Sequence, residues 1–353
     1  MAEHLSIFNS KKIPYSIIIL IVIFSTFELV TRIVFRPHIL PEEIYAEYSP
    51  NYDYGYDEKA PLFYKENDHL VLYSTSYLKF WRKEIPLIKS DNEFRLFVIG
   101  CSVSRGDYNS QYSFYMEQFL NENSGMNKFR VINCSATGIG SSRMLLILKK
   151  ILSHQPDFII LHPDGTNEFE DERDLKEAQE VKASYQGIIT KSWFFCVLKK
   201  YVDNNLLDKF KPQPEILPET YARWFVPGKR QEWLKTLITN ITEMVNISKQ
   251  NKTPIMFVSR AFNCDSLSVY ENEETIALNN VLESFVQKDV YEIDTPSIFL
   301  SHFGPRFDKK EIFLDTVHWK PVAHKVIARK IIDVLKQKKI IDETSYTLTE
   351  PIP

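Results

Sequence analysis

Two short motifs, far apart in the sequence, carry residue types that suit a nucleophile and its base. Ser102 lies in Gly100–Gly106, directly after an apolar run, which predicts a tight turn between a strand and a helix. A serine presented there beside backbone N–H groups can act as a nucleophile. Asp315 precedes His318 by three residues, a spacing that lets a carboxylate hold an imidazole. Each motif alone is weak, since serine and glycine are common at helix starts.

Two further segments could stabilise the negative charge that develops when a nucleophile attacks a carbonyl group. In Asn133–Gly140 a glycine can let the backbone approach a reacting centre closely. In Gly165–Glu168 the side chain of Asn167 can donate a hydrogen bond to a developing oxyanion, an interaction worth about 3 kcal/mol. Either segment alone is more often just a turn. The order of the four segments along the chain therefore matters more than any one of them.

The elements that must position these residues alternate between apolar strands and helices. Short apolar runs that end in glycine or polar residues are typical of buried parallel strands. The first three runs lie at 94–100, 129–135 and 157–165, separated by helical stretches at 113–122 and 142–153. Later strands are predicted at 253–259 and 290–296, and later helices at 230–250 and 322–335. This alternation predicts an α/β fold with a doubly wound parallel sheet, and sites on such a sheet form at the carboxyl ends of its strands.

In this order, the four segments resemble the sequence blocks of the SGNH or GDSL-like hydrolases, a family named for Ser, Gly, Asn and His. The resemblance runs from about Phe94 to Leu335, with blocks at 100–106, 133–140, 156–169 and 315–328. It implies a flavodoxin-like three-layer α/β/α fold with a central parallel sheet. Within the family, the chain looks most like a bacterial membrane-anchored branch, whose N-terminal helix often contains a Glu and then an Arg.

The resemblance implies a role for each of five residues. Ser102 would be the nucleophile, His318 its base, and Asp315 the residue that orients the base. The oxyanion hole would comprise the Ser102 backbone N–H, the Gly138 backbone N–H and the Asn167 side chain. The family's mechanism requires no metal or organic cofactor, and the scattered histidines and cysteines suggest no ligand set.

Three positions depart from the family's pattern or leave a choice. Cys101 stands where the first block usually has an aspartate, but nucleophilic attack does not require a neighbouring acid, so we expect tuning rather than loss. Ala323 stands where a glycine usually follows the histidine, which affects only the start of the final helix. Gly140 competes with Gly138 for the second-block role, and the spacing from Asn133 favours Gly138.

The apolar run at 13–35, preceded by Lys11 and Lys12, is long enough to span a bilayer. Glu28 and Arg32 interrupt it, but their four-residue spacing lets them pair on one helix face. No small-residue cleavage site follows, so we predict an uncleaved transmembrane signal anchor. A buried core helix is the alternative, which a continuous rather than periodic apolar run disfavours. Basic residues on both sides leave the orientation undecided.

The length of 353 residues predicts one main globular domain with appendages. The expected segments are an N-terminal flank at 1–12, the anchor at 13–35, a juxtamembrane extension at 36–92, a hydrolase-like domain at 93–338 and a polar tail at 339–353. An insertion at about 169–229 is expected over the carboxyl edge of the sheet. Its candidate packing aromatics are Trp193, Phe194, Phe195 and Trp224.

The composition narrows the possible partners. Hydrophobic residues make up 44% and charged residues 25%, as in folded globular chains. A net charge of −3 without a long basic run argues against a nucleic-acid partner. The four cysteines form no Cys-x-x-Cys pair. A disulfide between Cys101 and Cys134 is conceivable, since both would end adjacent strands, but two small buried thiols are favoured.

These observations predict a membrane-anchored serine ester hydrolase, with the membrane as a partner through the N-terminal helix. A domain facing the extracytoplasmic side would meet envelope polymers, so acylated carbohydrate, O-acetylated in particular, is the expected substrate. A lipid or lysophospholipid ester is the nearest rival, because a membrane tether suits it too. A carbohydrate O-acyltransferase would differ only in preferring a sugar hydroxyl to water. A catalytically silent glycan-binding or assembly module is the non-enzymatic alternative.

Overall fold

A computed structural model describes most of the chain. The described residues are 12–34, 62–76, 79–106, 109–122, 128–136, 138–163, 229–261, 269–304, 308–315 and 317–342, with 168, 192, 194, 195 and 198. The chain divides into two compact units. One comprises Met1–Tyr52 with Lys176–Glu215, and the other comprises Asp53–Leu175 with Ile216–Pro353.

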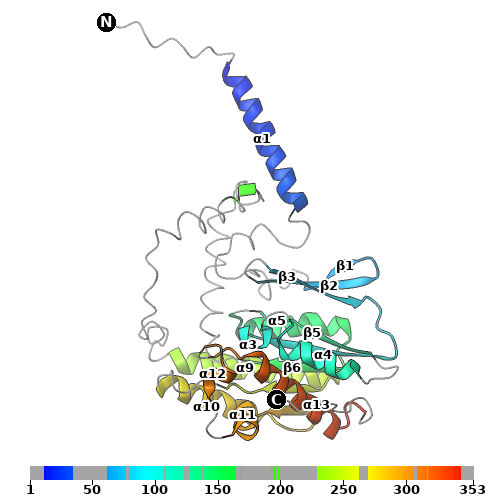
Figure 1. Cartoon of the computed structure of the whole chain (residues 1–353), viewed down its shortest axis with the longest axis vertical. Helices are drawn as coiled ribbons and strands as arrows, with labels where there is room; N and C mark the ends of the chain where they lie inside the picture. Colours follow the sequence, from blue (N-terminus) through cyan, green and yellow to red (C-terminus); the bar gives the residue numbers. More distant parts are fainter. Residues whose placement is uncertain are drawn as a thin grey trace. The chain divides into compact units, whose positions relative to one another are not determined.

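The larger unit is built around a five-stranded, fully parallel sheet (Figure 1). Its strands are β4 (Glu93–Gly100), β5 (Lys128–Asn133), β6 (Phe158–His162), β7 (Ile255–Val258) and β8 (Val290–Ile293). Their order in space, β5-β4-β6-β7-β8, is the flavodoxin-like order that begins with the second strand, returns to the first and then continues outward. The predicted α/β class and parallel sheet are therefore confirmed. The strand order reverses between β4 and β6, which is where such sheets form their sites.

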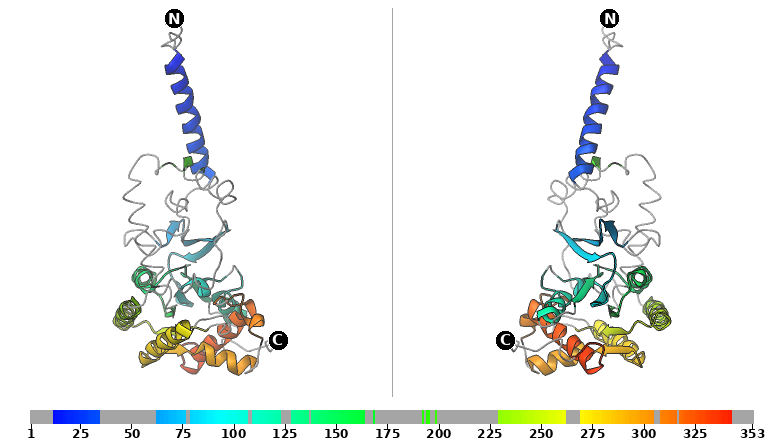
Figure 2. Two further views of the ribbon diagram at one scale, coloured as in Figure 1. Left: turned by 90° about the vertical axis from the view of Figure 1, so that its left-hand side faces the viewer. Right: turned by 90° about the vertical axis from the view of Figure 1, so that its right-hand side faces the viewer.

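Helices cover both faces of the sheet, as Figure 2 shows. One face packs against α4 (Tyr112–Glu122), α11 (Thr295–Phe303) and α13 (Pro321–Gln337), and the other packs against α5 (Ser141–Ile151), α9 (Lys229–Gln250) and α10 (Val269–Ser284). Successive side chains of β4 alternate between the two cores: Leu96 and Val98 lie in the first, Phe97 and Ile99 in the second. The three-layer arrangement that the family resemblance implies is thus confirmed.

The last helix shows why this pattern was easy to predict. Ile327, Ile331 and Leu335 of α13 recur at helical spacing and are fully buried against the sheet. Each such burial stabilises the fold by about 1.5–3 kcal/mol relative to an exposed side chain.

By contrast, α10 and α11 were not predicted. α11 has nine residues, and its clearest start signal is its N-cap, Asp294, whose carboxylate accepts a hydrogen bond from the Ser297 N–H at 3.3 Å.

A second, antiparallel sheet lies where an extended juxtamembrane arm was predicted. It consists of β1 (Tyr64–Glu66), β2 (His69–Ser76) and β3 (Lys79–Pro86), in that order. Leu70, Leu72 and Ile85 from these strands belong to the same buried cluster as Phe97 of β4. No strand was predicted within the juxtamembrane extension at 36–92, because the apolar run of β2 is short and ends in Ser and Thr, and charged residues interrupt β3.

The smaller unit contains the N-terminal helix α1 (Lys12–Val34). Nineteen of its residues, Tyr15–Ile33, are apolar enough to cross a membrane. Most of these apolar side chains are exposed, so the alternative of a buried core helix does not hold. Arg32 Nε lies 2.7 Å from Glu28 Oε1, as their spacing predicted. Of the aromatics predicted in the insertion, Phe194 and Phe195 are described, whereas Trp193 and Trp224 lie outside the described residues.

Candidate active site

The turn that carries Ser102 is short and sterically constrained. β4 ends at Gly100, and α3 (Ser102–Arg105) is a single helical turn closed by the Arg105 N–H on the Cys101 carbonyl oxygen at 2.9 Å. A Cβ atom on Gly100 would lie 2.8 Å from the carbonyl oxygen of His162 on the neighbouring strand β6. Only glycine therefore lets the strand end so close to β6, and Ser102 follows at the point where the strand order reverses.

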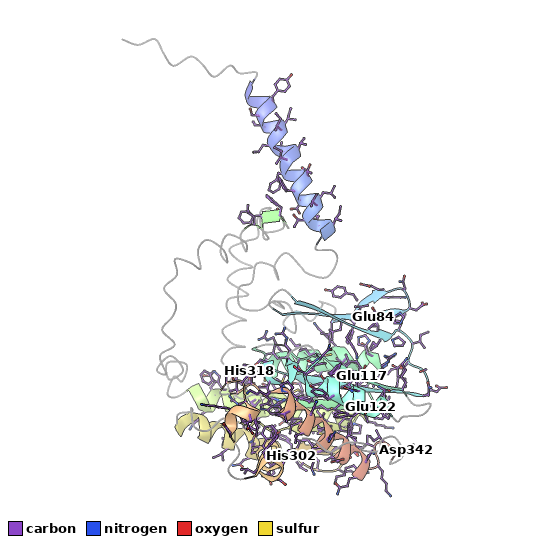
Figure 3. All side chains as sticks on the ribbon, in the orientation of Figure 1. Glu84, Glu117, Glu122, His302, His318 and Asp342 are labelled. Atoms are coloured by element: carbon purple, nitrogen blue, oxygen red, sulfur yellow. The ribbon has the colours of Figure 1, made fainter. Side chains whose placement is uncertain are left out.

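His318 reaches the same turn from the other end of the sequence. It lies on the loop between α12 (Lys309–Ile312) and α13 (Figure 3). This loop is held by a bridge between Phe313 and Trp319 and by a hydrogen bond from the Leu314 N–H to the His318 carbonyl oxygen at 2.8 Å. His318 Nε2 lies 2.9 Å from Ser102 Oγ. A nucleophile and a base candidate separated by 216 residues are thus within hydrogen-bond distance.

Asp315 completes the chain of contacts. Its Oδ2 lies 2.6 Å from His318 Nδ1, and its Oδ1 accepts hydrogen bonds of 2.8 Å from the backbone N–H groups of Val317 and His318. Burial raises the pKa of Asp315, but the hydrogen bonds from the His318 ring and the two backbone donors, together with the charge of the ring, outweigh burial and lower this pKa from 3.8 to about 2. The carboxylate is therefore ionised at neutral pH and accepts the Nδ1 proton, which leaves Nε2 as the acceptor facing Ser102.

The second-block glycines have different conformations. Gly138 has a φ of 67°, a left-handed conformation that favours glycine. Its carbonyl oxygen accepts a hydrogen bond from the fully buried Arg143. Gly140 has a φ of −93° and is the N-cap of α5. Gly138 is thus the position that requires glycine. Asn167, the third predicted oxyanion donor, lies outside the described residues.

Glu168 is a buried residue of this region whose contacts sequence reasoning missed. Its Oε1 accepts from the Ser141 N–H at 2.6 Å, and its Oε2 accepts from Ser141 Oγ at 2.9 Å. Asn240 on α9 donates to the same Ser141 Oγ at 2.8 Å. The start of α5, three residues after Gly138, is therefore tied to the residue that follows Asn167 in sequence. An acidic residue in the first turn is a common sequence signal for the start of a helix. Here the acidic residue comes from a remote segment, so local sequence patterns do not reveal it.

A cluster of buried aromatic and imidazole rings lies beside the His318 loop. Trp319 has its ring centroid 5.1 Å from that of His162 and 5.4 Å from that of His324, and Tyr112 packs on both histidines. Burial is the main cause that lowers the pKa of His162 and of His324 to about 3, and neighbouring basic groups add to this lowering. Both rings are therefore neutral at pH 7. This uncharged stack supports the residue next to His318.

Two cysteines and the possible metal-binding side chains are the remaining candidates for redox or metal chemistry. Cys101 and Cys134 are both buried as thiols. Across the part of the chain that the structure describes, no group of three or more His, Cys, Asp or Glu side chains could hold a metal ion.

Comparison with known proteins identifies similarity only at the level of solved structures. No family model matches the sequence, and no curated protein matches it. The acetylxylan esterase Axe2 from Geobacillus stearothermophilus is 13% identical, with 71% of this chain and 95% of that chain covered and a TM-score of 0.43. TesA is 13% identical, with 70% and 99% covered and a TM-score of 0.41. LAE5, an α/β hydrolase from the metagenome of Lake Arreo in Spain, is 12% identical, with 68% and 94% covered and a TM-score of 0.41. Likeness at this level carries nothing about substrate.

Proposed function

We propose that this chain is a serine ester hydrolase of the SGNH type, with Ser102 as nucleophile, His318 as base and Asp315 as the residue that orients the base. One observation supports this most: Ser102 Oγ, His318 Nε2, His318 Nδ1 and Asp315 Oδ2 form a continuous chain with contacts of 2.9 and 2.6 Å. These are the contacts through which an ionised aspartate orients a neutral imidazole toward a hydroxyl group.

The reaction proceeds in two steps. The Ser102 oxygen attacks the ester carbonyl carbon while His318 Nε2 takes the hydroxyl proton, and the same proton then passes to the departing alcohol. Water attacks the resulting acyl-enzyme, again with His318 as base, and releases the acid and free Ser102. The Ser102 and Gly138 backbone N–H groups and the Asn167 side chain would stabilise the oxyanion in both steps.

A fluorophosphonate probe tests the nucleophile directly. We expect covalent labelling of the wild-type chain and none of Ser102→Ala. Ser104→Ala, which removes another serine of the same turn, serves as the matched control and should still be labelled. Equal labelling of the wild type and Ser102→Ala would overturn the assignment. A silent binding module would instead bind glycan without turnover and take no label.

The proposed substrate is an O-acetylated carbohydrate of the cell envelope, with α1 as the membrane anchor and the hydrolase domain outside the cytoplasm. The length and apolar exposure of α1 support the anchor. Protease treatment of intact cells tests the orientation, since an outward domain should be cleaved. Release of acetate rather than long-chain acids from matched esters would support carbohydrate deacylation. The reverse preference would favour a lipid or lysophospholipid esterase, and transfer to a sugar hydroxyl would indicate an acyltransferase.

A further inference from the structure

One face of α1 differs from the rest of the helix. Phe24, Phe27, Glu28 and Thr31 recur at helical spacing and share this face. The Glu28 side chain is only 17% exposed, whereas Leu29, the next residue along the chain, is 59% exposed. A helix that only crossed a bilayer would expose its apolar side chains to lipid all round. Phe24 and Phe27 are 45% and 51% exposed, but the shielding of Glu28 and Thr31 on this face indicates a protein partner within the smaller unit.

That partner is a part of the insertion far away in sequence. Glu28 Oε2 accepts hydrogen bonds from Ser192 Oγ at 2.8 Å and from the Phe194 N–H at 3.0 Å. Glu28 Oε1 accepts from Arg32 Nε at 2.7 Å. A carboxylate within an apolar span is costly unless its charge is balanced and its oxygens are hydrogen-bonded. Three donors here supply both, and two of them come from residues more than 160 positions away.

Apolar contacts reinforce the polar ones. The Phe194 ring stacks on Phe27 with centroids 5.0 Å apart and meets Phe24 edge-on at 5.7 Å. Ser192 Oγ also accepts from the Phe195 N–H at 3.2 Å. Beyond this contact, Leu198 is 44% exposed and Phe195 is partly exposed. The docked segment thus presents apolar side chains of its own.

From these contacts we propose that Ser192, Phe194, Phe195 and Leu198 belong to a second membrane element, docked on α1 through Glu28 and lying at the boundary between headgroups and acyl chains. The proposal rests on α1 being the membrane anchor of the proposed function. Glu28 lies five residues before Ile33, the end of the span, which at 1.5 Å per residue is about 7.5 Å from that end. Interfacial elements bury their apolar side chains at about this depth, 5–10 Å. Residues fixed to α1 at this depth are surrounded by the same lipid as the helix, so their exposed apolar side chains contact lipid.

Spin labelling of the full chain in phosphatidylcholine–phosphatidylglycerol vesicles tests the proposal. A nitroxide is placed at Leu198→Cys in a background with Cys196→Ser and Cys264→Ser. The matched control is Ile88→Cys in the larger unit, an apolar residue that is 83% exposed. We expect the ratio of oxygen to nickel-chelate collisions to be at least threefold higher at 198 than at 88. Equal ratios would overturn the membrane location, and dipolar broadening between labels would show contact with a second copy instead of lipid.

Removal of the carboxylate tests the docking contact. Glu28→Leu keeps the span apolar but removes both acceptors, so the label at 198 should become more mobile and its collision ratio should fall toward that of 88. Leu29→Ala, one residue along on the exposed face, should leave the spectrum unchanged. An unchanged spectrum in Glu28→Leu would overturn the role of Glu28. These readouts need no enzymatic activity and should be identical in Ser102→Ala, so failure of the proposed esterase function would leave them unaffected.

Discussion

Replacement of Asp315 by asparagine should impair the proposed reaction more than the small change in size suggests. The backbone N–H groups of Val317 and His318 both lie 2.8 Å from Oδ1, so an amide must place its carbonyl oxygen there. Its NH2 group then faces His318 Nδ1, where Oδ2 of the carboxylate lies at 2.6 Å in the wild type. The amide donates to Nδ1, which moves the ring proton to Nε2, facing Ser102. His318 then has no lone pair for the serine proton.

The expected magnitude follows from the exposure of the pair. In a well-characterised serine protease the equivalent change lowers kcat by about 10⁴-fold. The Asp315 side chain is 52% exposed, so water competes with the amide and we expect about 10²–10³-fold, or about 3–4 kcal/mol in activation free energy. The lowered pKa of Asp315, about 2 against 3.8, corresponds to about 2 kcal/mol of stability, and solvent screening reduces this to about 1 kcal/mol. Activity should thus be lost while the fold remains.

The assay compares kcat/KM for p-nitrophenyl acetate at neutral pH with the urea midpoint of unfolding. Asp315→Ala should lose less activity than Asp315→Asn, because it removes the carboxylate without forcing the wrong tautomer. Asp294→Asn is the control and should keep its activity. It makes the same substitution at a carboxylate that accepts a backbone hydrogen bond at the start of α11. Activity of Asp315→Asn close to that of the wild type, or a greater loss in Asp315→Ala, would refute the tautomer reasoning.

Three further predictions concern the residues around the site. Glu168→Ala should lower both kcat and the free energy of unfolding, the latter by about 3 kcal/mol, because two hydrogen bonds to Ser141 are lost. Glu122→Ala, on the exposed end of α4, is the control and should change neither quantity. Gly100→Ala should destabilise the fold by more than about 2 kcal/mol in urea unfolding, because the added Cβ has no room. A Cβ added at Gly304 has no atom within 4 Å, so Gly304→Ala should destabilise the fold by only about 1 kcal/mol, through its positive φ. His324 has its pKa lowered to about 3, so unfolding binds a proton there and its contribution to stability should fall as the pH drops from 6.5 toward 3, by about 2 kcal/mol at pH 5. His162, with the same lowered pKa, should add a similar loss. His324→Asn should therefore roughly halve this pH dependence in urea titrations at pH 7 and pH 5, and an unchanged slope would contradict it.

Much of the architecture could be predicted because its signals are local. Apolar runs, their spacing and the residues that end them reflect the period of a strand or helix, so β4, β6 and α13 were predicted close to their true bounds. The same reasoning failed for β2, whose apolar run is short and ends in Ser and Thr, and for β3, which charged residues interrupt. It also missed α10, which lies within a polar stretch. Packing against neighbouring surfaces, rather than their own sequence pattern, decides the secondary structure of these elements.

The sequence by itself determined the apolar N-terminal helix, the alternation of strands and helices, and the order in which Ser102, Gly138, Asn167 and His318 follow one another. Only the tertiary structure decided which of these side chains meet. The 2.9 Å contact between Ser102 and His318 depends on the strand order that places β4 between β5 and β6. The contacts of Glu28 with Ser192 and of Glu168 with Ser141 likewise join distant segments. Local periodicity reports which face of an element is apolar, whereas hydrogen bonds between distant elements depend on how those faces pair, which no local pattern encodes.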